Sequence, residues 1–158
     1  MKRYLLLAAL AACGGGSDAN VAGNYTMAIT NRDNGCNFNG YTVGTQNSVA
    51  VNITQTDSDV MATVTGGGGF LLALVVGSNI YAGSVDGNDV DLKITGNIAM
   101  NMGNCAFTYN SEIHATADDN SMSGRIEYRS VTNMNSDCTA ITGCLTFQEF
   151  AGSRPPPP

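Results

Sequence analysis

The feature that most constrains this fold is a period of two in its apolar residues, interrupted at intervals by Asn, Asp and Gly. Val49, Val51 and Ile53 alternate with the small Ala50 and the polar Asn52. The turn-forming residues 56–59 separate them from a second alternating segment, residues 60–64. Successive side chains of a β-strand point to opposite faces, so this pattern predicts strands with one buried face. Two such segments joined by a short polar turn predict a β-hairpin.

The same pattern recurs along most of the chain. Further alternating segments occupy residues 23–30, 79–85, 89–95, 105–117, 122–129 and 144–150. Residues 31–35, which include an Asn-Gly pair, are expected to end the first of these segments. Residues 130–143 are expected to form a polar loop before the last one. The sequence therefore predicts an all-β protein of about eight strands with little helix.

Successive antiparallel strands leave two unpaired edges unless their sheet closes on itself. The sequence therefore predicts a small antiparallel up-and-down β-barrel, with a two-sheet β-sandwich as the alternative. The first strand begins with Gly23-Asn24-Tyr25. This start resembles the Gly-x-Trp of the lipocalin and avidin barrels, with Tyr in place of Trp, and the resemblance implies their topology alone. The chain contains no Trp, which argues against a biotin-type pocket.

One segment interrupts the alternation. Residues 70–76 are apolar throughout and follow four consecutive glycines at 66–69. Periodicity alone does not distinguish a strand buried on both faces from a short helix. We expect the apolar segment to belong to the core, preceded by a flexible glycine run that lacks the Lys-Ser or Lys-Thr of a phosphate-binding loop. A lid or an exposed contact surface is the alternative.

The first thirteen residues have the pattern of an export signal. Met1-Lys2-Arg3 gives a positive start, and an uncharged run far shorter than the about 20 residues of a membrane-spanning helix follows. The run ends in Leu10-Ala11-Ala12-Cys13, which resembles a bacterial lipobox, the cleavage site of a type II signal peptidase. The resemblance implies a lipid on Cys13, and Gly14 after it implies the outer membrane. An ordinary signal peptide is the alternative.

Cleavage before Cys13 would leave 146 residues, with thirteen acidic side chains against five basic ones and a net charge of −8. Such a charge argues against nucleic-acid binding. The predicted organisation is a signal peptide at 1–12, a lipidated cysteine with a flexible tether at 13–20, a barrel domain at 21–151 and a Pro-rich tail at 152–158. The predicted location is the bacterial cell envelope, where the lipid would anchor the protein to the membrane.

The four remaining cysteines are Cys36, Cys105, Cys138 and Cys144. An even number in an exported chain predicts disulfides, and four cysteines allow three pairings. We favour Cys138–Cys144, which would close a short loop, together with Cys36–Cys105, which would join distant parts of the chain. Zinc binding is the alternative use, but the sequence has no C-x₂-C pair and a single histidine, His114.

The sequence assembles no recognisable catalytic site. His114 would be the base of a serine or cysteine hydrolase, but no Gly-x-Ser-x-Gly elbow accompanies it and its alternating strand indicates a structural role. Most acidic residues cluster in predicted turns, at Asp57 and Asp59, at Asp86, Asp89 and Asp91, and at Asp118 and Asp119. They lack EF-hand spacing, so we interpret them as solvated residues rather than calcium ligands or glycosidase acids. We predict no enzyme activity, metal or cofactor.

Two functions remain. The first is a non-catalytic lipoprotein whose barrel binds a protein partner or has a structural role. The second is a carrier of a small apolar ligand inside the barrel. The residues expected to face that interior are Tyr25, Met27, Ile29, Val90, Leu92, Ile94 and Phe107. A roomy internal cavity would favour the carrier, whereas a barrel filled by its own side chains would exclude it.

Overall fold

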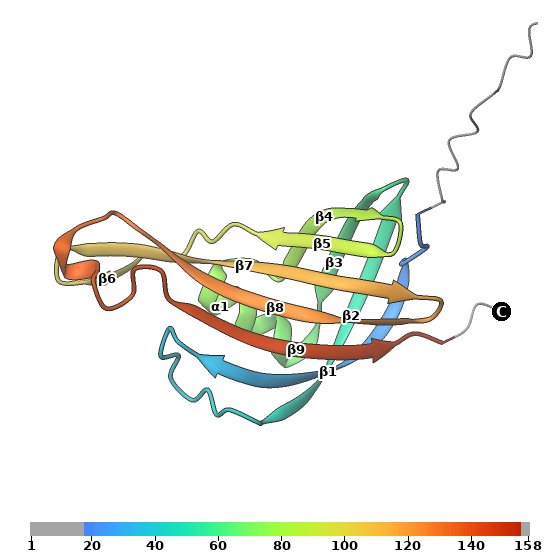
Figure 1. Ribbon diagram of the computed structural model, residues 1–158, viewed down its shortest axis with the longest axis horizontal. Helices are drawn as coiled ribbons and strands as arrows, with labels where there is room; N and C mark the ends of the chain where they lie inside the picture. The colour runs from blue at the N-terminus through green and yellow to red at the C-terminus, as the bar shows by residue number, and fades with distance from the viewer. Residues whose placement is uncertain (1–17, 156–158) are drawn as a thin grey trace, which may run out of the picture.

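The computed structural model describes residues 18–155, in which an antiparallel sheet closes into a barrel (Figure 1). In chain order the elements are β1 (Gly23–Asn34), β2 (Gln46–Thr56), β3 (Asp59–Val64), α1 (Gly66–Val76), β4 (Ile80–Asp86), β5 (Asp89–Ile94), β6 (Met100–Met102), β7 (Cys105–Asp118), β8 (Ser121–Thr132), the 3₁₀-helix η1 (Ser136–Cys138) and β9 (Leu145–Ser153). Eight strands form the barrel, because β5 pairs with β7 and β9 returns to β1. The predicted up-and-down barrel is confirmed.

Three two-residue turns gather at one end of the barrel, on the right in Figure 1, which we name the turn end. Asp57-Ser58 joins β2 to β3, Gly87-Asn88 joins β4 to β5, and Asp119-Asn120 joins β7 to β8. The sequence predicted all three turns from their Asn, Asp and Gly residues. Asp57 and Asp119 have φ angles of 54° and 44°, a left-handed conformation that Asp and Asn tolerate better than most residues.

The interior near the turn end is filled by small apolar side chains. Val21, Val60, Val85 and Val90 are each at most 1% exposed. Three of these valines lie within two residues of the turns, and Val21 precedes β1. Alternating valines fit the half-buried surface of a twisted sheet well. This end of the barrel therefore has an ordinary packed core.

Both ends of the described chain cover the turn end. Asp18 Oδ1 accepts a hydrogen bond of 2.9 Å from the backbone N–H of Gly87. The guanidinium of Arg154 donates to the carbonyl oxygens of Asn20 at 2.6 Å and of Asp119 at 3.1 Å. The folded body therefore includes residues 18–20 and 152–154, which the sequence assigned to the tether and the tail.

The opposite end, which we name the helix end, contains α1 between β3 and β4 (Figure 1). The four glycines at 66–69 form its first turn, so the prediction of a flexible glycine run is wrong. Glycine has low helix propensity, and packing against β2, β3 and β7 therefore has to stabilise the helix. Gly77 ends it at a φ of 90°, where its N–H donates to the carbonyl oxygen of Ala73.

The two sides of α1 differ in exposure. Leu72 and Val76 are buried against the barrel, whereas Phe70, Leu71 and Leu74 are between 58% and 66% exposed. The apolar segment is thus a helix that packs one side into the core and covers this end of the barrel with the other. No helix within residues 18–155 is long and apolar enough to cross a membrane.

Two strands differ from their predicted lengths. β1 continues through residues 31–34, which the sequence assigned to a turn. The register of its pairing with β9 shifts between Asn31 and Asn34, and the pairing resumes at Asn34. β6 is a ninth strand that pairs only with the first residues of β7 and projects beyond the barrel (Figure 1). Its three residues are too few for a recognisable alternation.

The predicted number of disulfides is confirmed, but the favoured pairing is wrong. The bridges are Cys36–Cys144 and Cys105–Cys138, each with a Cα–Cα distance of 5.0 Å. Cys36 follows β1 and Cys144 precedes β9, and these strands become neighbours only when the barrel closes. Cys105 opens β7 and meets Cys138 of η1, which follows β8. Both bridges therefore lie at the helix end.

Candidate functional site

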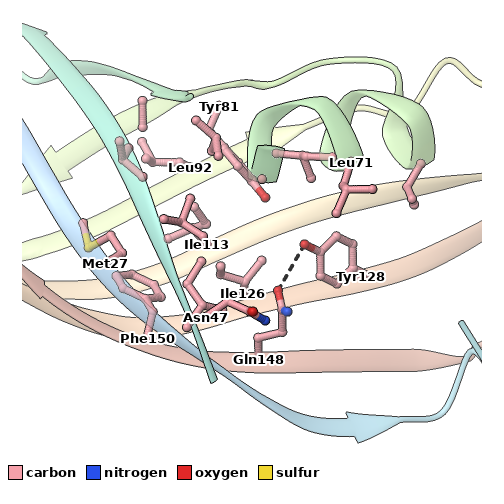
Figure 2. Close-up of a pocket in the computed structure, with 18 of the residues that line it drawn as sticks. Met27, Asn47, Leu71, Tyr81, Leu92, Ile113, Ile126, Tyr128, Gln148 and Phe150 are labelled. Atoms are coloured by element: carbon pink, nitrogen blue, oxygen red, sulfur yellow. Dashed lines mark hydrogen bonds between the residues drawn. The ribbon is translucent and has the colours of Figure 1, made fainter. Parts of the chain in front are cut away.

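The barrel interior is hollow next to α1. The cavity has a volume of about 480 Å³, within the range of about 300–1,000 Å³ typical of small-molecule pockets (Figure 2). All eight barrel strands and α1 contribute side chains to it. Representative apolar residues of its wall are Met27, Ile53, Leu92, Ile113, Ile126 and Phe150. The same alternating strands that fill the turn end thus enclose an apolar chamber further along the barrel.

Residues that line the cavity and are also exposed to solvent mark its mouth. They are Asn47 and Ser48 of β2 and Gly67 and Leu71 of α1. β2 pairs with β1 along its first residues but with β3 only from Val51 onward, so on the β3 side α1 rather than a strand lies beside the start of β2. The cavity therefore opens between the start of α1 and the start of β2.

A glycine makes the helix approach β2 closely at this mouth. A Cβ atom on Gly68 would lie 3.0 Å from a methyl group of Val49, which is tighter than ordinary van der Waals contact. Next to it, a Cβ atom on Gly67 would meet nothing within 4 Å. The first turn of α1 thus leaves space at the mouth, which larger residues would narrow.

Uncharged polar groups occupy one region of the wall. The Tyr128 hydroxyl donates a hydrogen bond of 3.2 Å to Gln148 Oε1, drawn as the dashed line in Figure 2. Gln148 Nε2 in turn donates to Asn31 Oδ1 at 2.7 Å. Above them, the hydroxyls of Tyr81 and Ser111 share a buried hydrogen bond of 2.8 Å. Of these side chains, Tyr81, Tyr128 and Gln148 line the cavity, where they offer hydrogen-bonding groups within a mostly apolar wall.

The phenols of this region stay protonated at neutral pH. Burial raises the pKa of Tyr81 well above its usual value. Burial also raises the pKa of Tyr128 to about 12. An ionised phenolate would lose its hydration inside the barrel, and this loss disfavours the charged form. The two tyrosines can therefore serve as hydrogen-bonding groups and do not supply a charge.

The structure brings together only part of the interior predicted from sequence. Met27, Ile29 and Leu92 line the cavity. The other predicted residues pack elsewhere in the fold, namely Tyr25, Val90, Ile94 and Phe107. Tyr25, Val90 and Ile94 are fully buried, whereas Phe107 packs edge-on against Tyr109 with ring centroids 5.5 Å apart.

Sequence reasoning missed the polar part of the cavity wall. Gln148 alternates with Thr146 and Phe150 on the inward face of β9, so a polar residue at an inward position was its visible signal. Tyr128 lies two residues after Ile126 in the alternating segment 122–129, so the two share a face, and both line the cavity. Asn47 precedes the alternating segment and gave no signal.

His114 lies on the outer surface of the barrel, away from the cavity. Its Nδ1 atom lies 2.6 Å from Asp91 Oδ1, and the two side chains are 57% and 66% exposed. Asp89 accepts a hydrogen bond of 3.4 Å from Thr116 beside this pair. A hydrolytic site would require a buried orienting acid next to the histidine, and Asp91 is exposed. Among the described residues, no group of three or more His, Cys, Asp or Glu side chains is placed to hold a metal.

Two further results bear on function. The lipobox and Cys13 lie outside the described residues. In comparisons with known proteins, no family model, curated protein or solved structure matches the chain.

Proposed function

We propose that this protein binds a small apolar ligand inside its barrel and carries it as a lipid-anchored protein of the bacterial cell envelope. The observation that carries the proposal is the apolar cavity of about 480 Å³ next to α1. Of the two functions considered from sequence, the carrier requires such a cavity, whereas a purely structural barrel does not.

Packing energetics support a bound ligand. Protein interiors are normally as dense as organic crystals, and the walls of an empty cavity lack partner atoms on one side. A ligand that fills the space restores these contacts, and each buried CH₂ contributes about 0.8 kcal/mol. The exposed residues at the mouth, Asn47 and Leu71 among them, provide a route between the solvent and the cavity.

A protein partner is the second candidate, and one observation favours it. Phe70, Leu71 and Leu74 expose a continuous apolar face of α1 beside the mouth. A soluble domain seldom leaves such side chains uncovered without an interaction. Figure 2 shows that Leu71 extends from α1 toward the cavity, so a partner on this face would lie next to the ligand route.

Native mass spectrometry of the protein purified from its own envelope tests the proposal. We expect a retained small molecule in the wild type and its loss in Ala62→Leu, because Ala62 is 3% exposed and lines the cavity. Ala82→Leu on the exposed side of β4 is the matched control and should keep the ligand. A mass shift that equals a protein, with no small molecule, would instead support the second candidate.

The proposed anchor has a separate test. Cys13→Ala should abolish acylation and release the protein from membranes, since several acyl chains on one residue bind far more tightly than one. Membrane fractionation and intact-mass measurement check this result. Unchanged partition into the membrane fraction would contradict the lipoprotein assignment and leave the cavity proposal intact.

A further inference from the structure

We propose that the ligand of this cavity is an uncharged molecule with an apolar body and one hydrogen-bonding group, such as a hydroxyl, carbonyl or amide. The inference rests on the proposed binding function and specifies the chemistry of the ligand. Its two parts, the neutrality and the single polar group, come from different features of the cavity wall.

The neutrality follows from the absence of charge on the wall. None of the side chains that line the cavity belongs to Asp, Glu, Lys, Arg or His. The nearby charges of β8 point outward, where Glu127 forms ion pairs with Arg125 at 2.9 Å and Arg129 at 2.6 Å. Burying a carboxylate or ammonium group without a partner costs several kcal/mol. A charged ligand would therefore find no compensation inside this barrel.

The position of the polar groups orients the ligand. Figure 2 shows Tyr128 and Gln148 toward the helix side of the cavity and Met27 and Phe150 away from it. An apolar body would contact Met27 and Phe150. Its polar end would then lie close to Tyr128 and Gln148.

The polar groups keep unused hydrogen-bonding capacity. Gln148 Nε2 has two hydrogens, and one of them is donated to Asn31. The Tyr128 oxygen donates its hydrogen to Gln148 and has two lone pairs, so it can accept a bond from a ligand besides one from the neighbouring Tyr81 hydroxyl. The cavity can therefore offer one donor and one acceptor to the same ligand group, which suits a hydroxyl, carbonyl or amide.

A buried residue holds this arrangement in place. Asn31 is 7% exposed, and its Nδ2 donates to the carbonyl oxygen of Thr42 at 3.1 Å. This bond leaves Asn31 Oδ1 directed at Gln148 Nε2. Because the hydrogen bond to Asn31 already fixes the orientation of the Gln148 amide, Gln148 would lose little side-chain freedom when a ligand binds. This preorganisation favours affinity.

A series of ligands with one alkyl chain tests the neutrality. Calorimetric titration of the full chain with 1-decanol, decanoate and decylammonium at neutral pH compares a neutral, an anionic and a cationic end group. We expect 1-decanol to bind at least about tenfold more tightly than either ion, because an unpaired charge loses its hydration in the cavity.

The outcomes distinguish the proposed ligand chemistry from the proposed binding function. Equal affinities, or tightest binding of decanoate or decylammonium, would overturn the inference about ligand chemistry and leave a binding cavity in place. Failure of all three compounds to bind would contradict the proposed function itself. Tight binding of 1-decanol alone supports both.

Two variants test the polar group. Tyr128→Phe removes a single oxygen, and Gln148→Leu removes the amide; each should weaken 1-decanol binding by about three- to tenfold, the value of one hydrogen bond. Tyr109→Phe is the matched control, because its hydroxyl lies outside the cavity wall, and its affinity should equal that of the wild type. Unchanged affinity in Tyr128→Phe, which preserves the ring packing, would overturn the assignment even if Gln148→Leu does not fold.

Discussion

The two ends of the barrel are stabilised by different means. The turn end is filled by valines such as Val60 and Val90, and hydrogen bonds from the chain termini cover it. The helix end encloses the cavity and contains both disulfides. A hollow interior buries fewer apolar contacts, and cross-links stabilise small domains whose core is insufficient. The comparison indicates that close packing stabilises the turn end, whereas the two disulfides stabilise the helix end, where the cavity reduces packing.

Removing the disulfides should have the largest effect. Cys36 and Cys144 are separated by 108 residues, against 33 for Cys105 and Cys138. In the chain-entropy model the longer loop contributes about 5 kcal/mol and the shorter about 4 kcal/mol. We therefore expect Cys36→Ala/Cys144→Ala to lower the free energy of unfolding by about 1 kcal/mol more than Cys105→Ala/Cys138→Ala in urea titrations.

Peptide mapping without reduction provides the control for these variants. It should recover one peptide pair that contains Cys36 with Cys144 and another that contains Cys105 with Cys138. If both double variants unfold at the wild-type urea concentration, the cross-links do not stabilise the helix end and the comparison between the two ends is wrong.

Alkaline pH should affect the helix end next. Burial raises the pKa of Tyr128 from 10.0 to about 12 in the folded protein. The corresponding stability is therefore fully present below about pH 10 and is lost as pH rises toward about 12, by about 2–3 kcal/mol. Urea titrations between these pH values should show a smaller loss in Tyr128→Phe than in the wild type.

A tyrosine of the other region sharpens this test. Burial raises the pKa of Tyr25 as well, but the positive charge of Arg154 beside its ring opposes the shift. Tyr25→Phe should therefore change the alkaline loss of stability less than Tyr128→Phe does. The reverse order would mean that the cavity wall does not disfavour the phenolate.

Two equally buried alanines compare the packed and hollow interiors directly. Ala117 of β7 and Ala62 of β3 are each 3% exposed, but only Ala62 lines the cavity. Ala117→Leu should overpack the core and cost about 1–3 kcal/mol, whereas Ala62→Leu has free space and should cost less than about 1 kcal/mol. Urea titration measures both. Equal losses would indicate that the cavity closes around its walls in solution.

The sequence predicted the strands and turns well because their signals are local. The alternation along β2 and β3 and the polar residues between them fix a hairpin whatever the rest of the chain does. The disulfide pairing depends instead on which strands become neighbours on closure. Proximity in sequence favoured Cys138–Cys144, but the return of β9 to β1 brings Cys144 to Cys36.

The cavity could be predicted only in part, for a related reason. Tyr25 and Met27 lie on the same inward face of β1, yet only Met27 lines the cavity. Alternation identifies the inward side chains, but the distance along the barrel axis decides whether they pack or enclose space. The helix that roofs the cavity has apolar residues on both sides, so it shows no helical period in the sequence.

Arg154 provides the smallest and most local test of the turn end. Its guanidinium donates to the carbonyl oxygens of Asn20 and Asp119, and a half-exposed group of this kind contributes about 1–2 kcal/mol. Arg154→Ala should therefore speed hydrogen exchange at the amide of Ala19, which bonds to the carbonyl oxygen of Gly87 at 2.7 Å. The α1 amides should exchange at the wild-type rate, because the two ends are held separately. Faster exchange at both ends would show that the barrel opens as one unit.

Arg154→Lys separates charge from geometry in this cover. Lysine keeps the positive charge but lacks the planar fork of Arg154, in which Nη2 donates to the carbonyl oxygens of Asn20 and Asp119 while Nη1 donates to that of Ala22. We expect exchange at Ala19 to be nearly as fast in Arg154→Lys as in Arg154→Ala. Wild-type protection of Ala19 in the lysine variant would mean that attraction between the positive charge and the acidic surface holds the chain termini over the turn end. The hydrogen bonds to Asn20 and Asp119 would then contribute little.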